Sequence, residues 1–77
     1  MEKEEFISFV AEILEVDAST LALSDRLEDI DWDSLANITF IAEVDTRFGV
    51  TLDADRLGQG QVVSDLYKLF ADSVAVA

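Results

Sequence analysis

Cysteine and histidine are both absent from this sequence. Without cysteine the chain can form neither a disulfide framework nor a thiolate metal site. Without histidine it lacks the usual general base and the imidazole metal ligand, so neither a Ser-His-Asp nor a Cys-His arrangement can form. We therefore expect a protein that is not an enzyme by itself, and we assign it no catalytic residue and no metal ligand.

Basic residues are scarce, since 5 Lys and Arg stand against 17 Asp and Glu and leave a net charge of −12. Such a field repels phosphate backbones and anionic membranes and attracts proteins with basic patches. Long apolar runs are also missing, because none approaches the roughly 20 residues of a membrane span. The acidic start at residues 1–5 is unlike a secretory signal. We expect no nucleic-acid partner, no membrane insertion and a cytoplasmic location.

The 77 residues, 51% of them apolar, suffice for one domain over residues 1–77 with a single small core. We expect it to be monomeric. Apolar residues recur at helical spacing near the amino terminus and predict an amphipathic helix over residues 3–15. Between residues 17 and 33 this periodicity is lost, which predicts a long loop pinned to the core by isolated apolar side chains: Leu21, Leu23, Leu27 and Ile30. Loops of this length in small domains are often functional.

A second helix is predicted over residues 34–48, where Gly49 suits a left-handed stop. Its core stripe comprises Phe40, Ile41, Val44 and Phe48, and a neighbouring stripe comprises Leu35, Ile38, Ala42 and Asp45. After it, Asp53 can cap a short helical turn that ends near Leu57. A last helix is predicted over residues 62–72, with residues 73–77 frayed.

The motif that carries chemistry is Asp33-Ser34-Leu35, placed between the long loop and the second helix and followed by Phe48-Gly49-Val50. Here the sequence resembles the acyl and peptidyl carrier protein family over nearly its whole length. The resemblance implies an all-α fold, a four-helix bundle with three main helices and one short third helix. It also implies that the Ser34 hydroxyl receives a covalent 4′-phosphopantetheine arm.

The resemblance further implies the roles of the neighbouring residues and partners. Asp33 helps to place a phosphopantetheinyl transferase and its metal ion, and Leu35 joins it in that contact. Partner enzymes that load, elongate or transfer acyl groups dock on Leu35, Ile38, Ala42 and Asp45. The chain is then a stand-alone acyl carrier protein that moves acyl or aminoacyl thioesters between enzymes.

Elementary chemistry agrees with this assignment. A serine at a helix start is exposed, and the free N–H groups of the first turn, with the positive end of the helix dipole, favour a phosphodiester. The simpler interpretation is that Asp33 and Ser34 only cap the helix. Capping is compatible with attachment of the arm at Ser34. The alternative from another class is an acidic helical interaction module without a prosthetic group, docking through the Leu35, Ile38 and Ala42 stripe.

Two further features of the segment before the second helix have alternative interpretations. The alternating Asp29, Asp31 and Asp33 resemble half of a calcium loop, but the sixth position holds Ser34 rather than Gly and the twelfth holds Phe40 rather than Glu. Only loose divalent-cation association stays open. Trp32 either shelters the root of the arm or is a half-buried ring that closes the loop onto the second helix.

The sequence departs from the family at two places. Asp31 stands where many carriers have Gly, so the loop is expected to approach the motif differently. On the second helix, where fatty-acid carriers have acids for basic partners, this chain has Ala36, Thr39, Thr46 and Arg47. This pattern favours a specialised pathway over housekeeping fatty-acid synthesis. Six further residues are assigned primarily to core packing, with opening to admit an acyl chain between the helices as the alternative: Phe40, Ile41, Val44, Leu57, Val63 and Leu66.

Overall fold

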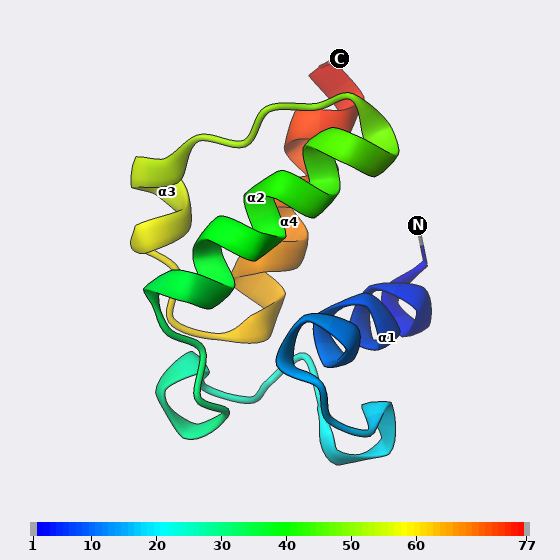
Figure 1. The fold of residues 1–77 in the computed structure, drawn as a ribbon, viewed down its shortest axis with the longest axis vertical. Helices are drawn as coiled ribbons and strands as arrows, with labels where there is room; N and C mark the ends of the chain where they lie inside the picture. Colours follow the sequence, from blue (N-terminus) through cyan, green and yellow to red (C-terminus); the bar gives the residue numbers. More distant parts are fainter. Residues whose placement is uncertain (1, 77) are drawn as a thin grey trace.

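The fold is a small bundle of helices in a computed structural model that describes residues 2–76 (Figure 1). Its helices are α1 (Lys3–Leu14), α2 (Ser34–Phe48), the short α3 (Ala54–Gly58) and α4 (Val63–Val76). Two 3₁₀ turns, η1 (Ala18–Thr20) and η2 (Leu27–Asp29), interrupt the segment between α1 and α2. No strand occurs within residues 2–76, so the predicted all-α bundle with a short third helix is confirmed.

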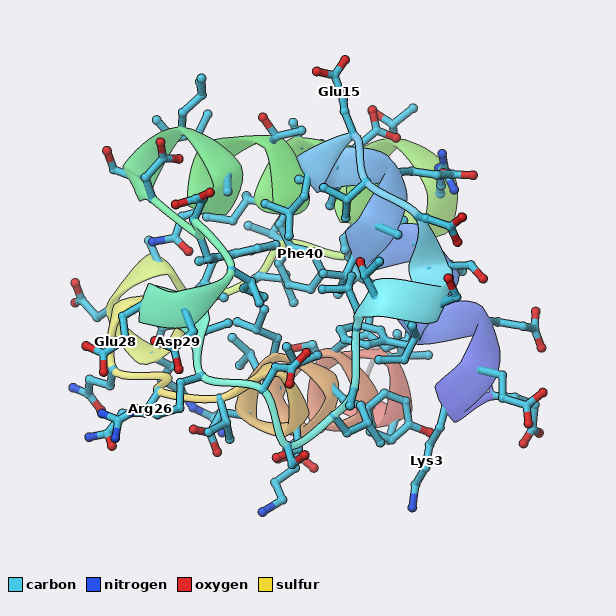
Figure 2. The ribbon with its side chains drawn as sticks, turned by 90° about the horizontal axis from the view of Figure 1, so that it is seen from below. Lys3, Glu15, Arg26, Glu28, Asp29 and Phe40 are labelled. Carbon is cyan, nitrogen blue, oxygen red and sulfur yellow. The ribbon has the colours of Figure 1, made fainter. Side chains whose placement is uncertain are left out.

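Aromatic rings from three helices form the centre of the core. Phe6 of α1 is fully buried, and its ring lies 5.9 Å from that of Phe40 in α2. The rings of Tyr67 and Phe70 in α4 lie 5.2 and 5.8 Å from Phe6. Edge-on and tilted pairs of this kind are favourable beyond the area they bury. Figure 2 shows Phe40 among the helices, while the labelled charged side chains lie at the periphery.

The long segment between α1 and α2 passes along one end of the molecule (Figure 1) and is fixed there by backbone hydrogen bonds to the start of α4. The Leu27 N–H donates to the Gln61 carbonyl at 2.9 Å, and the Ser64 N–H donates to the Leu23 carbonyl at 2.9 Å. The predicted apolar anchors are present, since Leu27 is buried and Leu21, Leu23 and Ile30 are half-buried. The segment therefore brings the start of α2 to a defined place.

Asp65 secures the point where this segment meets α4. Its carboxylate accepts the backbone N–H groups of Gln61 at 2.9 Å and Val62 at 3.2 Å, as a residue in the first helical turn does when it reaches back to the helix start. These two hydrogen bonds favour the charged form and hold the pKa of Asp65 below its ordinary value.

Helix ends depart from the predictions at two places. The last helix continues to Val76 instead of ending at residue 72, because no Gly or Pro stops it there. Residue 77, also predicted to fray, lies outside the described residues. Phe48, predicted to face the core, is 40% exposed and lies at its edge, with its ring 5.1 Å from that of Phe70.

Candidate functional site

The start of α2 is built by Asp33, which caps the helix. Its backbone is extended, and its carboxylate accepts the Ala36 N–H at 2.9 Å. The predicted capping role is therefore present. Because the cap engages the third N–H of the helix, the N–H groups of the first two helical residues are the ones a helix start leaves free for other acceptors.

Ser34 is the first residue of α2, and it is exposed. Its hydroxyl is therefore open to an incoming enzyme, at the positive end of a helix of 15 residues. A phosphodiester on this hydroxyl would meet the free N–H groups of the helix start, so the local chemistry fits a phosphopantetheine group.

One face of α2 is apolar and open to solvent. Leu35 is 68% exposed and Ile38 is 64% exposed, and Ala42 and Asp45 are exposed beside them. The predicted stripe is thus a real surface, and it begins next to Ser34. Exposed large side chains grouped on one face are typical of a docking surface.

Trp32 closes the loop onto α2. Its indole N–H donates to the Asn37 side-chain oxygen, and its ring lies 5.8 Å from Phe40 at an interplanar angle of 73°. The residue is half-buried. These contacts agree with the packing interpretation of Trp32, and they hold the loop against the first turns of α2.

Asp31, at the position where many carriers have glycine, adopts a backbone conformation that glycine also adopts. Its φ is +59°, the left-handed conformation that glycine adopts most easily. Aspartate tolerates this conformation better than most residues. The loop therefore turns here as a glycine would let it turn, at some cost in backbone strain.

The predicted thinning of the acidic α2 face is partly wrong. Ala36 is only 7% exposed, so it belongs to the interior and not to a partner surface. Arg47 is turned toward α1, where it pairs with Glu12 at 3.2 Å and with Glu43 at 3.1 Å. Its guanidinium also lies 5.0 Å from the Phe9 ring centroid. Single-sequence spacing could not separate this side of the helix from the docking side.

The three aspartates of the half calcium loop do not gather. Within residues 2–76 no group of three or more acidic side chains is arranged to hold a metal ion.

A hollow beside Ser34 was not foreseen from the sequence. It has a volume of about 210 Å³ and lies between the end of α1 and the start of α2. Ile13, Leu14 and Val16 form its α1 side. No local signal marks them, because they lie about 20 residues before the motif and read as ordinary core positions.

Comparison with known proteins identifies the class. Residues 4–70 match the protein family described as "Phosphopantetheine attachment site". Over 32 residues the chain is 53% identical to the non-reducing polyketide synthase Preu6 of Preussia isomera, which covers 42% of this chain and 2% of that protein. No solved structure matches significantly. None of the helices in residues 2–76 has the length and apolar character needed to cross a membrane.

Proposed function

Because the chain belongs to the phosphopantetheine attachment family, we propose that Ser34 is the residue that carries its arm. The family binds 4′-phosphopantetheine covalently and carries acyl thioesters on it, and its members are carriers rather than enzymes. The chain is therefore a carrier domain. The proposal adds which serine carries the arm, which kinds of partner dock, and on which surface.

The observation that carries the assignment is the exposure of Ser34 at the first residue of a long helix, directly after the aspartate that caps this helix. The other serines have different settings. Ser8 lies within α1, Ser19 within a 3₁₀ turn and Ser24 in a turn of the segment before α2, while Ser64 and Ser73 are half-buried in α4. Only Ser34 joins exposure to a helix start.

Activation of the Ser34 hydroxyl falls to a phosphopantetheinyl transferase, because the chain has no histidine. When bound, the arm supplies the thiol nucleophile that the polypeptide lacks. Asp33 holds the helix start in place through its cap, and its exposed position also suits the placing of the transferase metal ion. Leu35, Ile38, Ala42 and Asp45 form the docking stripe for the transferase and for acyl-handling enzymes.

For the pathway, we propose specialised rather than housekeeping synthesis. The local identity to a polyketide synthase supports this, although the chain spans only 2% of that protein. The exposed α2 stripe is apolar, with Asp45 as its acid. Operation as a separate, stand-alone carrier in the cytoplasm stays a prediction.

The test is intact mass after co-expression with a phosphopantetheinyl transferase. We expect one phosphopantetheine on the wild type, one on Ser24→Ala, which removes an exposed serine of the preceding segment, and none on Ser34→Ala. Modification of Ser34→Ala, or an arm mapped by peptide analysis to another serine, contradicts the assignment. An unmodified wild type favours the interaction module without a prosthetic group.

A further inference from the structure

The hollow beside Ser34 is an open groove whose walls are partly apolar and partly polar. Besides Ile13, Leu14 and Val16 it is lined by Ile30, Leu35 and Thr39. It also includes Asp31, Asp33 and Ala36, so residues on both sides of Ser34 belong to its lining. Any group attached to the Ser34 hydroxyl therefore starts at the border of this groove.

Two exposed apolar side chains mark the groove as a surface that folding alone does not explain. Val16 is 46% exposed and Leu35 is 68% exposed, and they come from different segments. Val16 is placed there by Glu15, whose left-handed backbone (φ +58°) ends α1 and turns the chain. Across the groove, Asp31 also has a left-handed backbone (φ +59°). Strained residues of this kind tend to occur at binding sites.

We propose that the groove between the end of α1 and the start of α2 binds the proximal, pantoyl half of the arm carried on Ser34. This inference rests on the proposed attachment at Ser34. The pantoyl part is uncharged and has two geminal methyl groups, which match the walls formed by Ile13, Val16 and Leu35. The amide N–H that follows it suits an oxygen acceptor, and Thr39 and Asp33 provide such oxygens in the lining.

The size of the groove agrees with this occupant. A volume of about 210 Å³ corresponds to roughly seven water molecules in the liquid. That is room for part of an arm and not for the arm together with a long acyl chain. Because the arm is tethered at the border, its effective concentration is on the order of millimolar, so weak contacts suffice to hold it.

The core is a poorer place for the arm. Phe40, Leu57 and Leu66 are 2% exposed or less, so the space among α2, α3 and α4 is filled by side chains. These residues would have to separate before anything entered, whereas the groove is already open. The arm can therefore lie against the protein without any opening of the core, and the opening considered for an acyl chain stays a prediction.

The experiment uses holo protein loaded from coenzyme A with a ¹³C-labelled pantetheine portion, with modification verified by intact mass. We expect isotope-filtered nuclear Overhauser effects between the geminal methyl groups of the arm and the methyl groups of Val16 and Ile13. Val16→Asp should weaken the contacts between the arm and the Ile13 methyl group by at least about threefold, since the new charge would be desolvated beneath the arm. Val74→Asp is the matched control, because Val74 is 40% exposed on α4, and it should leave them unchanged.

The outcomes separate this inference from the assignment of Ser34. Holo wild type without contacts from the arm to Val16 and Ile13 overturns the inference and leaves the attachment at Ser34 standing. Contacts from the arm to Phe40, Leu57 or Leu66 overturn it as well. Failure of the wild type to take up the arm overturns the proposed function, and the inference falls with it. The wild-type spectra decide the matter even if a variant does not fold.

Discussion

The two faces of α2 have similar side chains and opposite surroundings. On the inward face Phe40 and Val44 are fully buried, while on the outward face Leu35 and Ile38 are 68% and 64% exposed. Burial of a large apolar side chain is worth about 1.5–3 kcal/mol, so the outward residues forgo most of this stabilisation. Folding therefore explains the inward face but not the outward face, which we propose binds partner enzymes.

Removing a ring from the inward face should give the largest effect. Phe40→Ala should cost about 3–5 kcal/mol, because Phe40 contacts rings from α1 and the indole of Trp32. A domain of 77 residues has a total stability of about 4–12 kcal/mol, so much of the protein would be unfolded or close to it. Urea denaturation measures the loss.

The matched variant on the outward face is Ile38→Ala, which should change the free energy of unfolding by less than about 0.5 kcal/mol. If both variants lost the same stability, the two faces would not differ as described. If Phe40→Ala lost less than about 1 kcal/mol, the aromatic cluster would not be the centre of the core.

Truncating the outward face should instead affect partner recognition. Leu35→Ala and Ile38→Ala should each lower kcat/KM of a phosphopantetheinyl transferase by about 5- to 30-fold, which corresponds to 1–2 kcal/mol of lost contact. The control is Val74→Ala, an exposed apolar residue on α4, which should transfer at the wild-type rate. A loss in the control as large as in the two α2 variants would mean that transfer depends on general surface hydrophobicity and not on this face.

The sequence predicted the helices and the inward face well for a physical reason. Apolar periodicity and capping residues are local signals, and they placed α2 at Ser34–Phe48 and the Asp53 cap before α3. The failures arose where the answer depends on distant contacts. Arg47 could be assigned to α1 only through its pair with Glu12, 35 residues away in sequence.

The candidate site likewise has parts that local sequence signals predict and a part that depends on distant contacts. The motif and the exposed stripe could be predicted, because both lie within one helix and its cap. The groove could not, because its α1 side is brought to α2 by the segment that is bonded to the start of α4 at Leu23, Asp25 and Leu27. Backbone hydrogen bonds of that kind leave no trace in residue type.

Asp65 offers a test with a smaller expected effect. It caps the start of α4, to which the segment leading into α2 is hydrogen-bonded. Asp65→Ala should cost about 1 kcal/mol at pH 7, because it removes the acceptor of two N–H groups at the start of α4. The folded pKa of Asp65 is lowered, so its charge stabilises the fold above the unfolded value of about 3.9, and this contribution is lost as the pH falls through the folded pKa.

The wild type and Asp65→Ala should therefore converge in stability as the pH is lowered below about 4, measured by urea denaturation at a series of pH values. Asp45→Ala, an exposed acid on the outward stripe, serves as the control. A difference between wild type and Asp65→Ala that stayed constant down to pH 2 would show that the carboxylate charge contributes nothing.

Salt should give the smallest effect, and it acts on the surface rather than on the inward face. Residues 1–33 contain eleven of the 17 acidic residues and two of the five basic ones, and their repulsion opposes the compact state. At 0.1 M salt the Debye length falls to about 10 Å, which screens much of this repulsion. We expect a rise in Tm of about 2–4 °C between very low and moderate salt, or roughly 0.5 kcal/mol, and a further rise with millimolar magnesium or calcium.

The rise should be the same in wild type and Ile38→Ala, because neither the added ions nor the lost methyl groups alter the apolar core. Thermal scans across salt concentrations measure it, and a Tm indifferent to both salt and divalent ions would show that the acidic residues lie too far apart to repel one another.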